Sequence, residues 1–212
     1  MAETVGMQQL TLNDIEIGAR LVQALVHHVK RNGAVPIAYP ALLELGRFLD
    51  PKDAAMDRAE PLGIAVKLDF VAGFCRELGA PNLACLAVHP ATGRPAFACA
   101  GEVEVEVEVE VEVEVRRAAV AGFDWSAADA RLAAHAAALR ASVPVRLKPR
   151  RERPAEVSWY AYFTAHREAC KGVSSGDKKE VVNLVMAGLD PETALRRFLA
   201  AKAAYERAGE LA

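Results

Sequence analysis

An uninterrupted dipeptide repeat constrains the fold of this chain more than any other sequence feature. Residues 102–115 read Glu-Val seven times. In a β-strand, strict alternation places every valine on one face and every glutamate on the other. The repeat therefore predicts an extended strand or β-hairpin that projects as a wing or lies at the edge of a sheet.

The length of the repeat limits where such a strand can lie. Fourteen extended residues span about 46 Å, whereas a compact chain of 212 residues has a radius of gyration of about 17 Å. The segment must bend, form a hairpin or project. A ladder of carboxylates that gathers Ca²⁺ is an alternative, because hard cations prefer several oxygen ligands. A straight strand lacks the turns and carbonyls of calcium loops, so we predict no metal and no other cofactor.

Charge and composition indicate a globular protein with no bulk attraction for nucleic acid or anionic membranes. The chain has 26 basic and 28 acidic residues, a formal charge of -2, and 52% hydrophobic residues. Neither a signal-peptide pattern nor an apolar run of transmembrane length is present. The cysteines at 75, 85, 99 and 170 form no Cys-x-x-Cys pair, which is typical of reduced thiols. We therefore predict a cytoplasmic location and no membrane partner.

Three amphipathic helices are predicted in the first half of the chain. The first begins where Thr11 or Asn13 can cap it and ends at Gly33. The second covers residues 40–49 and starts at a proline, and the third covers residues 64–78 before a glycine.

Short extended segments are predicted between and after these helices. Residues 36–39 are predicted to be extended, and residues 50–63 irregular or partly helical. The apolar run 83–88 is bounded by helix breakers and favours a buried strand. Turn residues around Gly93 then favour reversal of the chain into residues 95–97.

This order of helix, strand, helix, helix, strand, turn and strand is that of a winged-helix module. The segments that carry the likeness are Ala38-Tyr39-Pro40-Ala41-Leu42-Leu43, Phe74-Cys75-Arg76, Pro81-Asn82-Leu83-Ala84-Cys85-Leu86-Ala87-Val88 and Thr92-Gly93-Arg94-Pro95. They resemble uncharacterised bacterial winged-helix-like proteins. The resemblance covers residues 13–97 and implies a fold, but no catalytic residue.

The second half of the chain is predicted to be helical. Ser126 and Asp129 form a capping-box-like start of a helix that ends near Ser142. Residues 178–187 and a helix beginning at Pro191 form a terminal pair. Segments Glu180 to Leu189 and Ala194 to Arg197 resemble the first two helices of a helix-turn-helix domain, but the third helix is missing. A helical hairpin is therefore predicted.

A basic, proline-rich segment is predicted to link these helices. Residues 143–154 contain three prolines, which favour an extended chain. The candidate nucleic-acid contacts are Arg146, Lys148, Arg150, Arg151 and Arg153. Aromatic residues at 159, 160, 162 and 163 follow, and they fit either base stacking or one helix face that packs on the core.

No recognisable catalytic motif is present. The five histidines show no metal-ligand spacing, and the chain lacks a nucleophile elbow, a phosphate-binding loop and a dinucleotide fingerprint. Cys75 or Cys85 would need a distant histidine as a base. The sequence therefore gives no catalytic, cofactor-binding or metal-binding residues and points away from an enzyme.

These observations predict a helix-rich α+β protein with two parts. Residues 1–117 form a winged-helix-like unit with the repeat as a strand, and residues 118–212 form a helical region. In a DNA-binding winged helix the third helix would read DNA, but Asp69 and Glu77 offset Lys67 and Arg76 there.

The predicted function is a non-catalytic interaction module that binds a protein partner. One alternative is weak, sequence-independent nucleic-acid binding through the basic segment. The other is an enzyme with an unrecognised site.

Overall fold

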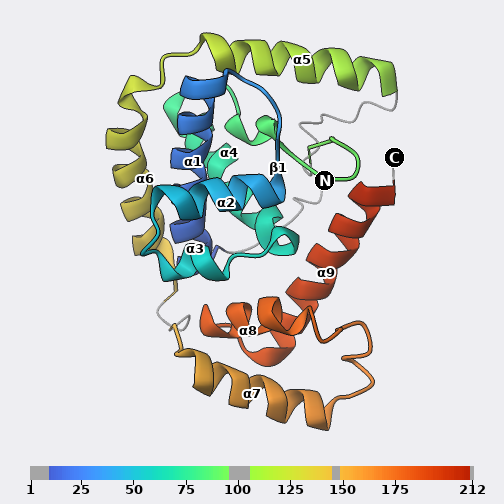
Figure 1. The fold of residues 1–212 in the computed structure, drawn as a ribbon. Coiled ribbons are helices and arrows are strands. Elements are labelled where there is room, and N and C mark those ends of the chain that lie inside the picture. The colour runs from blue at the N-terminus through green and yellow to red at the C-terminus, as the bar shows by residue number, and fades with distance from the viewer. Residues whose placement is uncertain (1–9, 96–105, 145–148, 211–212) are drawn as a thin grey trace, which may run out of the picture.

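The fold is built almost entirely of helices. The structure, a computed structural model, describes residues 10–95, 106–144 and 149–210. Its helices are α1 (Leu12–Asn32), α2 (Tyr39–Leu49), α3 (Ala54–Arg58), α4 (Ile64–Leu78), α5 (Glu106–Gly122), α6 (Ala128–Ser142), α7 (Glu152–Ala165), α8 (Lys178–Met186) and α9 (Pro191–Glu210). The strands are β1 (Ile37–Ala38) and β2 (Ala87–Val88), and the 3-10 turns are η1 (Pro61–Gly63), η2 (Leu83–Leu86) and η3 (Trp125–Ala127). A helix-rich class is therefore confirmed (Figure 1).

The predicted ends of α1 and α4 are confirmed by their caps. Thr11 and Asp14 form a capping box, in which the Asp14 N–H donates to Thr11 Oγ1 at 3.2 Å and the Thr11 N–H donates to Asp14 Oδ2 at 2.9 Å. Gly33 and Gly79 end the two helices with φ angles of 75° and 67°. Such positive φ angles are unfavourable for residues with a side chain, so glycine fits both ends.

The predicted strand at 83–88 is mostly wrong. Leu83 to Leu86 form a 3-10 turn whose start is capped by Asn82, and only Ala87 and Val88 are extended. The four residues of the turn are at most 1% exposed. A short run buried on all sides does not distinguish a strand from a buried turn.

The small sheet is parallel, with β1 paired to β2 in the register Ile37 to Ala87 and Ala38 to Val88. The predicted reversal after β2 is present, because Val88 and Pro95 form an antiparallel bridge. Residues 96 and 97 lie outside the described residues. The resemblance to winged-helix proteins stays a prediction.

The predicted strand in the Glu-Val repeat is wrong over Glu106 to Val115, which lie in α5. The first residues of the repeat, 102–105, lie outside the described residues. Glutamate is a strong helix former, and valine loses less than about 0.7 kcal/mol relative to alanine. A helix satisfies its own backbone hydrogen bonds, whereas a long strand needs a partner. The sheet that the structure describes offers only strands of two residues.

The end of α5 is anchored in the core. Val120 is fully buried, and Trp125 Nε1 donates to its carbonyl oxygen at 3.0 Å. Val115, at the end of the repeat, is 64% exposed. The two valines of one helix therefore differ in burial.

This difference gives a direct test of the helix. Val120→Ala is expected to lower the free energy of unfolding by about 2 kcal/mol, because it removes buried methyl groups. Val115→Ala is expected to change it by less than about 0.5 kcal/mol, because the side chain is exposed and alanine favours a helix. Urea unfolding followed by circular dichroism measures both. Equal losses at the two positions would contradict the placement of α5.

The start of α6 also differs from the prediction. Asp124, rather than Ser126, accepts the capping hydrogen bond, from the Ser126 N–H at 2.9 Å, and a 3-10 turn precedes the helix. Ala127 at the N-cap makes no side-chain hydrogen bond. The predicted end at Ser142 is confirmed.

The terminal helices match the prediction, but the basic segment does so only in part. Asp190 caps α9 by accepting from the Thr193 N–H at 2.9 Å, and α9 continues without a break. Glu152 to Pro154, predicted to be extended, form the first turn of α7. Proline is tolerated there because a first-turn N–H has no partner within the helix.

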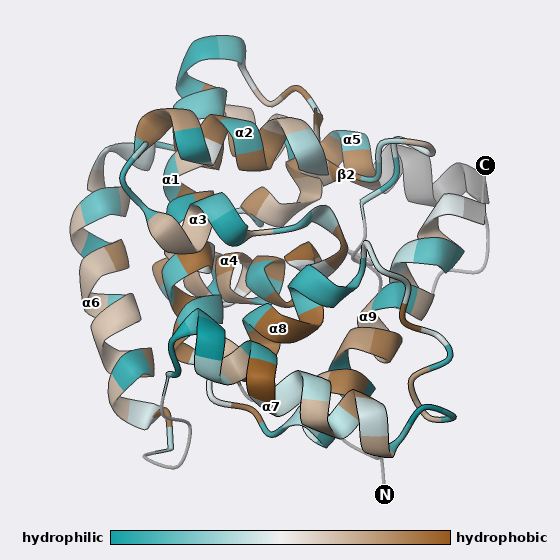
Figure 2. Ribbon diagram, turned by 60° about the horizontal axis from the view of Figure 1, so that its bottom comes forward, coloured by the Kyte–Doolittle hydropathy of each residue, from teal (hydrophilic) through white to brown (hydrophobic). Residues whose placement is uncertain are grey.

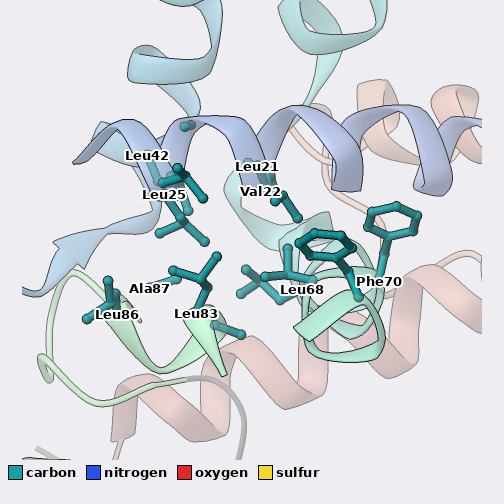
Figure 3. Packing of buried hydrophobic residues seen from close by; sticks show 14 of the residues in the cluster. Leu21, Val22, Leu25, Leu42, Leu68, Phe70, Leu83, Leu86 and Ala87 are labelled. Carbon is teal, nitrogen blue, oxygen red and sulfur yellow. The ribbon is translucent and has the colours of Figure 1, made fainter. Parts of the chain in front are cut away.

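Two apolar clusters form the interior. The first joins α1, α2, α4, η2 and α6, and Figure 3 shows Leu21 and Leu25 of α1 facing Leu68 and Leu83. The second joins α7, α8 and α9 around Trp159. Figure 2 shows α8 between α4 and α7. The division of the chain at residue 117 stays a prediction, and the packing places α6 in the first cluster.

Candidate functional site

Charged side chains join the two apolar clusters. Lys67 of α4 is 3% exposed, and its Nζ lies 3.3 Å from Oε1 of Glu180 in α8, a residue that is 5% exposed. Lys67 Nζ also lies 3.9 Å from Asp14 Oδ1 of α1. We call Asp14, Lys67, Glu180 and Arg197 the charged seam.

Asp14 is the most heavily paired member of the charged seam. Its Oδ2 accepts from Arg197 Nη2 at 2.6 Å and from Thr11 Oγ1 at 2.8 Å. Burial by itself would raise the pKa of Asp14, but the charges of Arg197 and Lys67 and the hydrogen bonds from Thr11 lower it below the ordinary value of 3.8. Asp14 is therefore ionised at neutral pH.

Gly63 allows Glu180 to reach Lys67. A Cβ at this position would lie 2.0 Å from Glu180 Oε1 and 2.8 Å from Lys67 Nζ. Asn183, one turn after Glu180, donates to Glu180 Oε2 at 3.4 Å and to the Arg58 carbonyl oxygen at 2.8 Å. The α8 side chains are thus fixed against η1 and the end of α3.

A cleft of about 220 Å³ opens beside the charged seam. Its polar and charged lining is Asn13, Glu16, Arg58, Lys67, Arg150, Glu180 and Asn183, and its remaining walls are Leu12, Ile17, Ala55, Ala59, Pro149, Met186 and Ala187. We call it the seam cleft. Helices α1 and α4 of the first cluster and helix α8 of the second cluster contribute to its walls.

The structure brings together part of the predicted basic site. The Arg150 N–H donates to the Met186 carbonyl oxygen at 2.7 Å, and the Arg150 side chain lines the seam cleft. Arg151 and Arg153 are exposed at the start of α7. Arg146 and Lys148 lie outside the described residues.

The aromatic residues of α7 do not form one face. Trp159 is 3% exposed and stacks with Tyr162 at a centroid distance of 6.0 Å. Tyr160 points outward and is 67% exposed. Base stacking by the whole set is therefore excluded, and packing on the core holds for Trp159 but not for Tyr160.

An exposed stripe follows the outer side of α7. Arg153, Val157, Tyr160 and Thr164 are all exposed at helical spacing. Val157 is 62% exposed. In the part of the chain that the structure describes, no carboxylate lies within ion-pair distance of Arg151 or Arg153. We call these residues, with Arg151, the outer face of α7.

Cysteine chemistry finds little support. Burial raises the pKa of Cys75 to about 11, although its sulfur accepts a hydrogen bond from the Leu83 N–H at 3.4 Å. Cys85 and Cys170 are also buried, and Cys99 lies outside the described residues. Thiolate nucleophiles need the opposite, an exposed site that stabilises negative charge.

The described residues offer neither a metal site nor a membrane-spanning helix. Among residues 10–95, 106–144 and 149–210, no group of three His, Cys, Asp or Glu side chains is arranged to hold a metal ion. Within those ranges, no helix has both the length and the apolar character needed to cross a membrane.

Sequence reasoning missed the charged seam. From the sequence, Lys67 is one of the third-helix charges that Asp69 and Glu77 offset, but in the structure it is buried beside Leu68. The available signal was a charged residue on the apolar face of a helix, as at Asp14 and Glu180. Such a residue is rarely buried without a partner.

No protein-family model, curated protein or solved structure matches this chain.

Proposed function

We propose that this protein is a non-catalytic interaction module that binds an acidic, partly apolar segment of a protein partner on the outer face of α7. The observation that carries the proposal is that exposed apolar side chains and exposed arginines lie on the same helix. Val157 and Tyr160 are both more than 60% exposed. Arg151 and Arg153 lie at the start of the helix, and in the described part of the chain no carboxylate is within ion-pair distance of either.

The chemistry of this face favours a protein over a nucleic acid. Tyrosine and arginine are the residue types most often found as anchors in protein interfaces. Arginine forms bidentate contacts with carboxylates, and Val157 offers an apolar contact that a phosphate backbone does not use. The buried Trp159 removes one of the candidate stacking residues.

A fluorescence-anisotropy titration tests the proposal. The probes are a labelled peptide of alternating glutamate and valine, a scrambled acidic peptide without apolar residues, and random duplex and single-stranded oligonucleotides, each at 50 and 200 mM salt. We expect the glutamate-valine peptide to bind best. Tyr160→Ala and the double change Arg151→Ser with Arg153→Ser are each expected to weaken it at least about tenfold.

Arg131→Ser is the matched control, because Arg131 is an exposed arginine on α6, away from α7. It is expected to leave peptide binding unchanged. Nanomolar binding of oligonucleotides at 200 mM salt, lost in the double arginine variant, would replace the proposal with nucleic-acid binding. Failure of every probe to bind would also reject it.

A further inference from the structure

The geometry points to a second binding site in the seam cleft, which takes a small organic anion that carries a carboxylate or a phosphate. This site is separate from the outer face of α7.

The cleft has more positive than negative groups. Its lining holds three cations, Arg58, Lys67 and Arg150, and two carboxylates, Glu16 and Glu180. Glu180 is already engaged by Lys67 and Asn183. Positive charge therefore remains at the two arginines.

Neither arginine is neutralised within the part of the chain that the structure describes. No carboxylate of those residues lies within ion-pair distance of Arg58 or Arg150, and the side-chain contact of Arg150 is a hydrogen bond of 3.4 Å to Ser158 Oγ. Glu16, the remaining carboxylate of the lining, is exposed. Guanidinium groups match the planar oxygens of carboxylates and phosphates.

The structure fixes the position of Arg58. The Asn183 side-chain amide donates to the Arg58 carbonyl oxygen at 2.8 Å. Arg47 Nη2 donates to the next carbonyl oxygen, that of Ala59, at 2.6 Å. These bonds satisfy carbonyl groups at the end of α3. The backbone from which the Arg58 side chain extends is therefore held by two other elements.

Size and walls indicate the class of ligand. A volume of about 220 Å³ lies below the range of about 300 to 1,000 Å³ typical of pockets for drug-sized molecules. Ile17, Ala59 and Met186 supply apolar walls. A small anion with a short apolar portion fits both observations better than an inorganic ion alone.

Ligand-observed and protein-observed NMR test the inference. Butyrate, a simple alkyl phosphate and inorganic phosphate are titrated to 20 mM at constant ionic strength, with chloride as the reference salt. We expect saturable chemical-shift changes at Met186 and Ala187 with butyrate or the alkyl phosphate. The relative affinities of these two probes identify the preferred anionic group.

Arg58→Gln is the decisive variant, because it removes the guanidinium and keeps the backbone carbonyl that Asn183 binds. The dissociation constant is expected to rise at least about tenfold. Arg131→Gln is the control for loss of one positive charge and should leave binding unchanged. Circular dichroism confirms that both variants fold.

Three results would overturn the inference: no saturable shift with any probe, equal shifts in Arg58→Gln, or equal shifts with chloride. Tyr160→Ala separates this site from the proposed partner site. It is expected to weaken the glutamate-valine peptide and leave the anion titration unchanged, so either proposal can fail without the other.

Discussion

Gly63→Ala is expected to lower the free energy of unfolding by about 3 kcal/mol, because it breaks a buried ion pair. The new Cβ would lie 2.0 Å from Glu180 Oε1 and 2.7 Å from Glu180 Cδ. The carboxylate must move away, and both it and Lys67 then lose a partner in a buried site. For a chain of this length the melting temperature should fall by roughly 6 to 12 °C.

Gly73→Ala is the matched control. Gly73 lies in α4, and a Cβ there would meet nothing within 4 Å. Alanine favours a helix over glycine by up to about 1 kcal/mol, so the variant should be as stable as the parent or slightly more stable. Urea unfolding of both variants makes the comparison. A loss below about 1 kcal/mol in Gly63→Ala would show that Glu180 has room to move.

Asp14→Asn is expected to have the largest effect, a loss of about 4 kcal/mol at neutral pH. Asp14 is 1% exposed, and its carboxylate contacts both Arg197 and Lys67. Asparagine keeps the shape and can still accept from Thr11, but it removes the negative charge that Arg197 and Lys67 both contact. Since folded proteins are stable by about 5 to 15 kcal/mol, this loss is a large share of the total.

The pH dependence of this loss distinguishes a charge effect from a packing effect. The pKa of Asp14 is lowered in the folded protein, so its stabilisation is fully present above pH 4 and is lost as the pH falls through the lower folded value. The difference between parent and Asp14→Asn should shrink below pH 4. Between pH 5 and 7 it should also fall slightly as the pH rises, because burial and the charge of Asp14 raise the pKa of the neighbouring Asp69 to about 6. A difference that stays constant at low pH would indicate packing. Asp57→Asn, at an exposed position in α3, serves as the control.

Local signals predicted several helix ends correctly. The capping residue Thr11, the glycines at 33 and 79, and Pro191 marked ends that the structure confirms. Each of these signals acts within one turn of the chain, so its meaning does not depend on the rest of the fold.

The repeat shows where periodicity misleads. Alternation of Glu and Val fits a strand, but Glu106 to Val115 are helical. A strand of that length needs a partner that the described residues do not supply, and a helix needs none. The sequence pattern indicates which residues would share a face in a strand or in a helix. It does not indicate whether a partner strand is available for backbone hydrogen bonds.

The candidate sites depend on contacts that are distant in sequence. Arg150 and Tyr160 were singled out from composition and order. The pairing of Lys67 with Glu180 joins residues 113 positions apart, and that of Asp14 with Arg197 joins residues 183 positions apart. A single sequence contains no information on such pairs beyond the presence of charges on apolar helix faces.

Helix α9 belongs to both apolar clusters. Ala194 and Phe198, near its start, are fully buried in the second cluster, and Tyr205, further along, packs on the first and lies 4.5 Å from His89 between ring centroids. Figure 1 shows α9 running from beside α8 toward the other end of the molecule. A fragment that ends at Ser142 therefore lacks Tyr205, and one that begins at Glu152 lacks the surface on which Tyr205 rests. The two halves are suited to fragment complementation, in which each piece alone is incomplete and mixing them restores one cooperative unit.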